Sequence, residues 1–222
     1  QNAGCGIQTA GLCVGGEGPS YSDLSEEYNG TSWTEGNDLN TARAFLTALG
    51  LQTAALAVGG YDGSSGYGLV ESYNGTSYTE VNNINTARNS SGSSGILTAG
   101  LVFGGGPPAG GLTEEFDGTN WTESGDLNTV RRTLAGSGTQ TASLAFGGST
   151  DPGGVLAVTE QYNGSTWTEV ADLNTARSAL AGGGTQTSAL AFGGTAFVAV
   201  TESWDGTSWT EVADMADGRR EL

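Results

Sequence analysis

Five arginines are the residues of this sequence best placed to do chemistry as a set. They recur once in every 42 to 46 residues, at Arg43, Arg88, Arg131, Arg177 and Arg219. A planar guanidinium binds anions and sugar hydroxyls, and it also forms fixed ion pairs with carboxylates. One interpretation is therefore a ligand contact in each repeat. The other is an ion pair between repeats, and we favour it because a residue kept in every unit is typically part of the packing. Aspartates that precede four of the arginines by five positions are the expected partners: Asp38, Asp126, Asp172 and Asp214.

The chain contains no histidine, and this removes several classes of enzyme. Ser-His-Asp and Cys-His nucleophilic sites, histidine bases and histidine metal sites all need that side chain. A glycosidase would need two carboxylates near the centre of the fold, where Glu221 is the only acid expected. We therefore expect a protein that is not an enzyme. We also expect no cofactor and no metal, since the turns at Asp62 and Asp151 lack a full calcium-loop signature.

The charge balance limits the partners. The sequence has 24 acidic residues and seven arginines, which gives a net charge of −17 at pH 7. No basic patch is available to bind nucleic acid or an anionic membrane. The longest apolar runs fall far short of the ~18 residues needed to cross a bilayer. We therefore expect neither nucleic-acid binding nor membrane insertion.

The arginines are one of four markers that recur in the same phase. Each unit has an aromatic-Asn/Asp-Gly step, a second aromatic five residues later and a glycine doublet. The steps begin at Tyr28, Tyr73, Phe116, Tyr162 and Trp204, and the second aromatics are Trp33, Tyr78, Trp121, Trp167 and Trp209. Because a unit of about 44 residues cannot bury both faces of a sheet alone, the units must stack on one another.

Each unit is predicted to form four short antiparallel strands. In the last unit, residues 178–183 and 187–192 form two apolar strands, and 198–204 alternates like a half-buried strand. Asn-Gly supplies the tight turn of the outer hairpin. Radial closure protects the strand edges of such units. The prediction is one all-β domain, a five-bladed β-propeller with blades at about 1–36, 43–81, 88–124, 131–170 and 177–212, closed by a tail at 213–222.

The repeat resembles the kelch family of propellers. The apolar run before a glycine doublet, the later Tyr and Trp, and the downstream arginine carry this resemblance over essentially all 222 residues. Only four residues separate the two aromatics, which is fewer than in most kelch units and shortens the outer hairpin. The sequence motif Tyr-Asn-Gly-Thr-Ser-Trp-Thr-Glu is also similar to repeat arrays in structural proteins of marine phages. Neither likeness fixes a function.

Two sets of side chains are expected to have structural roles. The second aromatics should pack between blades, where a large ring buries the most surface. Ten glutamates should form a solvated acidic rim that also discourages edge-to-edge pairing. They are Glu27, Glu71, Glu115, Glu160 and Glu202 on the third strands, and Glu35, Glu80, Glu123, Glu169 and Glu211 after the second aromatics.

Cys5 and Cys13 should lie on adjacent strands about three positions out of register, which is poor geometry for a disulfide. Two cysteines do not indicate whether the protein works in an oxidising or a reducing compartment.

Function is expected in the loops that follow the glycine doublets, because these differ from blade to blade. Aromatic and acidic residues there are the candidate ligand contacts: Tyr21, Tyr61, Asp62, Tyr67, Asp151 and Phe197. The chain is thus predicted to be a non-catalytic binding propeller that recognises a glycan or a protein, outside the cell or on a virion. The alternative is a purely structural module of a virion or surface layer, which would be part of a larger assembly. A glycosidase-like carboxylate enzyme is the third interpretation.

Overall fold

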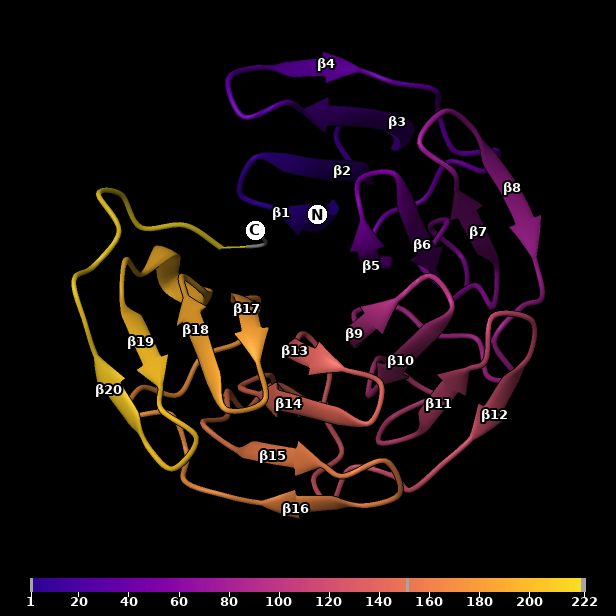
Figure 1. The fold of residues 1–222 in the computed structure, drawn as a ribbon. Coiled ribbons are helices and arrows are strands. Elements are labelled where there is room, and N and C mark those ends of the chain that lie inside the picture. Colours follow the sequence, from indigo (N-terminus) through magenta and orange to yellow (C-terminus); the bar gives the residue numbers. More distant parts are fainter. Residues whose placement is uncertain (1, 151, 221–222) are drawn as a thin grey trace.

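A computed structural model describes residues 2–150 and 152–220 of the chain. Twenty strands form five separate sheets of four antiparallel strands each, arranged around an axis as a five-bladed β-propeller (Figure 1). The all-β prediction and the number of blades are therefore confirmed. A single 3-10 turn, η1 (Thr195–Phe197), is the only helical element among the described residues, and no helix in that part of the chain is long and apolar enough to cross a membrane.

The strands of each blade follow one another from the axis outwards. Blade 1 contains β1 (Ala3–Ile7), β2 (Ala10–Glu17), β3 (Tyr21–Tyr28) and β4 (Trp33–Glu35). Blade 2 contains β5 (Thr47–Leu51), β6 (Ala54–Val58), β7 (Val70–Tyr73) and β8 (Tyr78–Val81). Blade 3 contains β9 (Gly92–Ile96), β10 (Ala99–Phe103), β11 (Thr113–Phe116) and β12 (Trp121–Glu123). Blade 4 contains β13 (Ala135–Thr139), β14 (Ala142–Phe146), β15 (Thr159–Tyr162) and β16 (Trp167–Glu169). Blade 5 contains β17 (Ala181–Thr185), β18 (Ser188–Phe192), β19 (Thr201–Trp204) and β20 (Trp209–Glu211).

The outer hairpins are closed by the predicted Asn-Gly and Asp-Gly turns. In blade 4, the Asn163 side-chain oxygen accepts hydrogen bonds from the backbone N–H groups of Ser165 and Thr166. Gly164 has a φ of +91°, a conformation that an L side chain rarely adopts. The same carboxamide or carboxylate bonds recur in the other four blades. The dipeptide therefore sets the turn in every unit.

The innermost strands begin later than the sequence predicts. The expected strand at 178–183 starts at Ala181, because Ala179 adopts a left-handed backbone conformation that turns the chain towards the axis. Phe45, Ser90 and Thr133 have the same conformation at the equivalent positions. The third strand of this blade is also shorter than predicted, Thr201–Trp204 instead of 198–204, since the preceding residues belong to the loop.

The inner strands converge because their side chains are small. A Cβ atom on Gly136 would lie 2.5 Å from the carbonyl oxygen of Ser93 in the neighbouring blade. All five inner strands line an axial cavity of about 290 Å³. Its walls offer backbone groups, hydroxyls, the apolar side chains of alanines and leucines, Asn2 and Cys5, and no carboxylate among the described residues.

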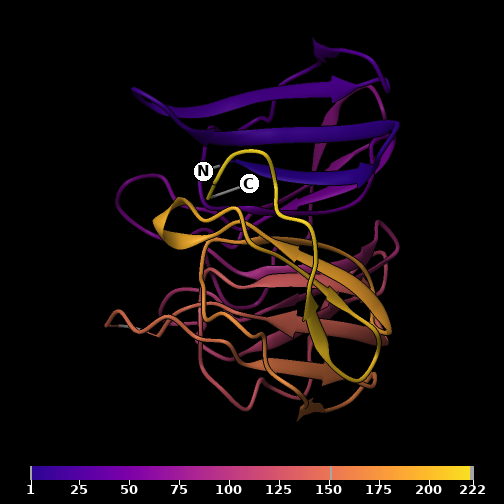
Figure 2. The ribbon, with the colours of Figure 1, turned by 90° about the vertical axis from the view of Figure 1, so that its left-hand side faces the viewer.

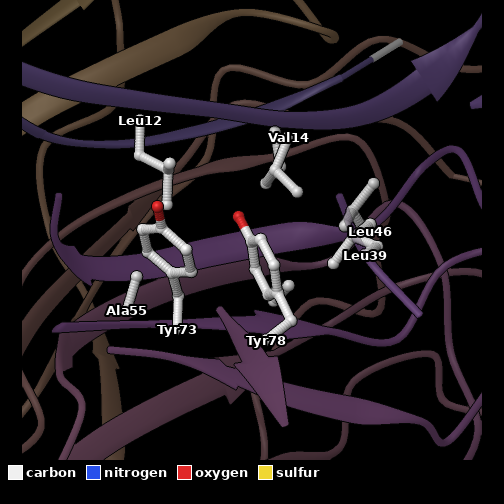
Figure 3. Close-up of a cluster of buried hydrophobic side chains, with 9 residues drawn as sticks. Leu12, Val14, Leu39, Leu46, Ala55, Tyr73 and Tyr78 are labelled. Atoms are coloured by element: carbon white, nitrogen blue, oxygen red, sulfur yellow. The ribbon is translucent and has the colours of Figure 1, made fainter. Parts of the chain in front are cut away.

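The core lies between blades. Between blades 1 and 2, Leu12 and Val14 of one sheet pack against Tyr73 and Tyr78 of the next (Figure 3). Leu39, from the linker that joins the two blades, closes the same cluster. Similar clusters join blades 2 and 3, 3 and 4, and 4 and 5. Each sheet thus obtains its burial from its neighbours, as the repeat length requires.

Four of the five second aromatics occupy these interfaces as predicted. Tyr78, Trp121, Trp167 and Trp209 are 5–7% exposed. Trp33 is the exception and is 51% exposed. The prediction of interblade packing is wrong for this residue in the structure, because blade 5 does not cover the face of blade 1 that carries it.

The two cysteines are free thiols. Cys5 pairs with Leu12 and Cys13 pairs with Gly4, so the cysteines are one position out of register and not three. Successive positions on paired strands point to opposite faces of the sheet, which explains why no disulfide forms. Burial raises the pKa of Cys5 to about 12. Burial also raises the pKa of Cys13, against the effect of a hydrogen bond from Asn2.

These raised pKa values predict slow thiol chemistry in the folded protein. At pH 8 both thiols should remain protonated, and the thiolate is the reactive form. We expect Ellman's reagent to report little fast-reacting thiol in the native protein and two thiols in 8 M urea. A Cys5→Ser variant should still show a slow native thiol from Cys13. Rapid reaction of both thiols in the native protein would contradict the burial.

Candidate binding surface on the loop face

The interblade linkers and the variable loops share one face of the propeller, as the sequence predicts. In each blade the second glycine of the doublet donates a hydrogen bond to the carbonyl of the linker arginine, as Gly148 does to Arg177 at 2.9 Å. In four of the blades the arginine N–H in turn donates to the variable loop, as Arg177 does to Leu156 at 3.1 Å. Gly148 has a φ of +108°, so glycine is needed at this crossing. These bonds fix the base of every loop.

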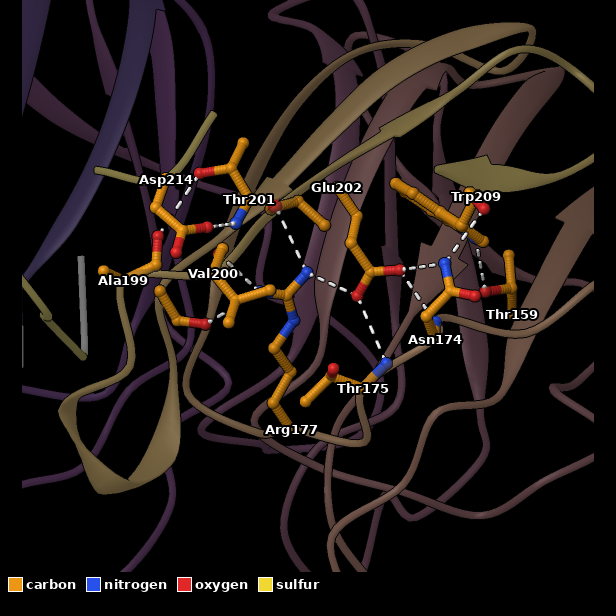
Figure 4. Close-up of polar contacts among 12 residues, drawn as sticks. Thr159, Asn174, Thr175, Arg177, Ala199, Val200, Thr201, Glu202, Trp209 and Asp214 are labelled. Carbon is orange, nitrogen blue, oxygen red and sulfur yellow. Dashed lines mark hydrogen bonds and ion pairs between the residues drawn. The ribbon is translucent and has the colours of Figure 1, made fainter. Parts of the chain in front are cut away.

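The linker arginines form buried ion pairs. Arg177 donates from Nη2 to Glu202 at 3.0 Å, and from Nη1 to the carbonyl of Val200 at 2.6 Å (Figure 4). The second oxygen of Glu202 accepts the backbone N–H and the side-chain amide of Asn174, at 2.7 and 2.8 Å. The carboxylate therefore joins the linker to the third strand of the following blade.

The same type of ion pair occurs between three other pairs of neighbouring blades. Arg43 pairs with Glu71, Arg88 pairs with Glu114, and Arg131 pairs with Glu160 at 2.6 Å. Burial lowers the pKa values of Arg88, Arg131 and Arg177, and the paired glutamates act in the opposite direction. A guanidinium nevertheless keeps its charge in proteins.

These contacts correct two predictions. The four arginines are 0–1% exposed, so they cannot contact a ligand in this structure and are structural residues. Their partners are glutamates of the third strands and not the nearby aspartates. Asp126, Asp172 and Asp214 instead accept the N–H of the first residue of a third strand. Arg219 differs from the other four because it is exposed.

The expected acidic rim is only half present. The glutamates after the second aromatics are exposed in all five blades. On the third strands, by contrast, Glu71, Glu160 and Glu202 are completely buried. The prediction of a solvated position is wrong for these three, because they point between blades to neutralise the arginines. Glu27 and Glu115 are half-buried and accept the hydroxyls of Tyr73 and Tyr162 at 2.5 Å.

The structure brings several predicted ligand contacts together where the loops of blades 1 and 2 meet. The rings of Tyr21 and Tyr61 pack edge to face with centroids 6.1 Å apart. Phe45 packs against Tyr61 in the same way at 6.3 Å. Tyr67 donates a hydrogen bond to Asp62 at 3.0 Å. We call Tyr21, Phe45, Tyr61, Asp62 and Tyr67 the aromatic cluster.

Asp62 organises the blade 2 loop of this cluster. Its Oδ1 accepts the backbone N–H groups of Ser64 and Ser65 and the hydroxyl of Ser64, while Oδ2 accepts Tyr67. These bonds, led by the one from Ser65, hold the pKa of Asp62 well below its usual range. The bond to Asp62 raises the pKa of Tyr67. The loop therefore presents a fixed carboxylate beside half-buried rings.

Tyr21 is the one residue of the aromatic cluster that lines a hollow beside the blade 1 loop. Tyr21 forms part of the wall of a cavity of about 750 Å³, together with loop residues 15–24, Asn2 and Arg220. Partly exposed rings beside hydrogen-bonding groups are suited to a ligand with one apolar face and several hydroxyls. Phe45 was not among the predicted contacts. The sequence did contain a signal for this residue, because Phe45 is a large aromatic at a position where three other blades have the small residues Ser90, Thr133 and Ala179.

Two predicted contacts lie elsewhere. Phe197, in the blade 5 loop, is 61% exposed, and the guanidinium of Arg220 lies 4.7 Å from its ring centroid. No ring contact joins Phe197 to the aromatic cluster among the described residues. Asp151 lies outside the described residues, as does Glu221. No group of three or more potential metal-binding side chains occurs in the part of the chain that the structure describes.

Fold and loop geometry together define the class of this protein as a five-bladed repeat β-propeller with a variable loop face. A comparison with protein-family models gave no match, and a comparison with curated proteins gave none either.

Proposed function

We propose that this propeller is a non-catalytic binding protein that recognises a glycan through the loop face, outside the cell or on the surface of a virion. The observation that carries the proposal is the aromatic cluster, of which Tyr21 also lines the 750 Å³ hollow. Tyrosine rings give a large contact area at a low cost in side-chain entropy, and they can stack on the apolar face of a sugar ring. The kelch-like character of the repeat is part of the same proposal.

The polar chemistry of the site supports a glycan over a protein ligand. Asp62 has its carboxylate already oriented by four hydrogen bonds, so accepting a sugar hydroxyl would need little reordering. The hollow is lined by polar residues such as Ser20, Ser22 and Asp23 as well as by the Tyr21 ring, which suits a ligand that keeps part of its hydration. A net charge of −17 argues against anionic ligands.

A glycan array probed with the labelled protein tests the proposal. We expect binding to a restricted set of neutral glycans, and at least a tenfold loss of affinity for Tyr61→Ala, because truncating a central aromatic contact usually costs more than 1.4 kcal/mol. Trp33→Ala is the matched control, since it removes an exposed aromatic that belongs neither to the aromatic cluster nor to the lining of the hollow. Circular dichroism checks that both variants fold.

Two outcomes would reject this function. The first is an absence of binding across the array. The second is binding that Tyr61→Ala and Tyr21→Ala leave unchanged while Phe197→Ala abolishes it. Hydrolysis of an array glycan would show instead that the protein is an enzyme.

A further inference from the structure

Two rings of the aromatic cluster, Phe45 and Tyr61, stand at positions where other blades have small residues. Viewed from the side, the loops that follow the glycine doublets lie at one face of the propeller (Figure 2). Blade 4 has Thr133 and Ser149 at these two positions, and their hydroxyls share a hydrogen bond at 2.9 Å. Equivalent isolated β-bridges hold Tyr61 and Ser149 in place. Small polar residues therefore satisfy the fold here, and the rings of blade 2 are not needed for it.

The rings of the aromatic cluster stand almost at right angles to one another. The interplanar angle is 86° between Tyr21 and Tyr61, and 76° between Phe45 and Tyr61. All three rings are half-buried, so each keeps some surface for contact with a ligand. A sugar ring stacks on a single flat aromatic face, whereas rings at right angles form the walls of a corner. Such a corner suits a compact group, and aromatic cages that bind quaternary ammonium groups are built in this way.

Two carboxylates add negative charge beside these rings. Asp62 accepts the hydroxyl of Tyr67 at 3.0 Å, and four hydrogen bonds keep its carboxylate charged and in place. The next residue, Gly63, lies against the ring of Tyr21, because a Cβ atom on this glycine would be 2.8 Å from Cε2 of the ring. Burial raises the pKa of the Tyr21 hydroxyl, and the charges of Glu17 and Asp62 raise it further. The cluster therefore combines aromatic faces with negative charge.

The arginines near the aromatic cluster have partners of their own. Arg43 and Arg88 are buried in ion pairs with glutamates. Arg220 lines the hollow together with Tyr21, but its guanidinium lies over the ring of Phe197, 4.7 Å from the centroid. An aromatic ring on the loop face thus already holds a cation. The net charge of −17 also favours the approach of positively charged ligands.

We propose that the aromatic cluster binds an organic ammonium group, with the charge against the rings of Tyr21 and Tyr61 and near the carboxylate of Asp62. This inference rests on the proposed glycan-binding function, because the ammonium group would be a substituent of the glycan. Tyr21 also lines the hollow of about 750 Å³, which has room for the rest of the glycan. Aromatic faces attract a cation, and a carboxylate beside them adds to the attraction. Neutral glycans would bind by ring stacking alone, and glycans with an ammonium group should bind more tightly.

Choline and 3,3-dimethyl-1-butanol test the role of the charge directly, because they have the same shape and differ by a quaternary nitrogen in place of a carbon. We expect isothermal titration calorimetry at low ionic strength to show that choline binds at least about fivefold more tightly. The difference should shrink as salt is added, since salt screens the attraction. Equal affinity for the two compounds, or an absence of choline binding, would overturn the proposal.

Two sets of variants test the named residues, with circular dichroism as the check on folding. The double variant Phe45→Thr, Tyr61→Ser gives blade 2 the pair of residues that blade 4 already carries, so it should fold and lose the preference for choline. Asp62→Asn keeps the shape of the side chain and should weaken choline binding at least about threefold. Glu169→Gln is its control, because it also removes one negative charge, from an exposed position on blade 4. Equal effects of Asp62→Asn and Glu169→Gln would overturn the proposal, since net charge alone would then attract the cation.

The glycan array separates this proposal from the proposed function. We expect glycans with a free amino sugar to give the strongest signals at pH 6, where the amine is protonated. If array glycans bind but choline binds no better than 3,3-dimethyl-1-butanol, the ammonium site is wrong and the glycan function stands. If choline is preferred and no array glycan binds, the glycan function is wrong and the ammonium group must have another carrier.

Discussion

Replacing Glu160 with alanine is expected to lower the free energy of unfolding by about 3–5 kcal/mol. Glu160 is completely buried and accepts Arg131 at 2.6 Å. It also accepts the backbone N–H and side-chain amide of Asn128 at 2.7 and 2.8 Å. Alanine would leave a buried guanidinium without its countercharge and several donors without an acceptor, and both are costly in a medium of low polarity. Since domains of this size are stable by about 5–15 kcal/mol, the loss is large.

Glu169 provides the control for this prediction. It is the same residue type, lies directly opposite Glu160 on the neighbouring strand, and is exposed. Glu169→Ala should change the free energy of unfolding by no more than about 0.5 kcal/mol. Urea unfolding followed by circular dichroism at pH 7 measures both. Equal effects of the two substitutions would show that the buried ion pair is not a principal interblade contact.

Trp167→Ala is expected to cost about 3–5 kcal/mol of stability. The side chain is 5% exposed and lies between blades 3 and 4. It packs on Phe103 and on Tyr162, with centroid distances of 4.8 and 5.0 Å. Its indole N–H also satisfies the buried hydroxyl of Thr113. Removing the ring opens a cavity at the centre of an interface and leaves that hydroxyl unpaired.

The exposed Phe197 tests whether ring size alone explains such a loss. Phe197→Ala should stay within about 0.5 kcal/mol of the wild type, since the ring is 61% exposed. Thermal unfolding by calorimetry would compare the two variants. If Trp167→Ala proved as mild as Phe197→Ala, the blades would not depend on the second aromatics for their packing.

The repeat made most of the fold predictable. Asn163 and Gly164 indicate the outer hairpin, and the structure shows the expected turn bonds. Five such turns in phase with five glycine doublets predict five blades, because equivalent residues make the same local interactions in every repeat. The start of each inner strand was less predictable. Ala179 has a left-handed backbone conformation. The sequence does not indicate this, because the residue is not the glycine that usually marks such a position.

The aromatic cluster could be predicted only in part. Tyr21, Tyr61, Asp62 and Tyr67 stood out because aromatic and acidic residues in variable loops are typical of recognition surfaces. Their meeting, with Phe45 added from a linker, depends on how the loops of two blades converge. No spacing in the chain encodes that convergence, since the loops differ in length from blade to blade.

The sequence by itself determined the repeat unit, its turns and the position of the arginines, because these depend on interactions between residues near one another in the chain. Only the tertiary structure decided what the arginines bind. Arg177 lies five residues from Asp172 but pairs with Glu202, 25 residues away. The tertiary structure also decided that Trp33 is exposed, whereas the equivalent second aromatics of the other four blades are buried. The physical reason is the same in both cases, because the neutralisation of a buried charge and the covering of a ring depend on which sheet stacks against it.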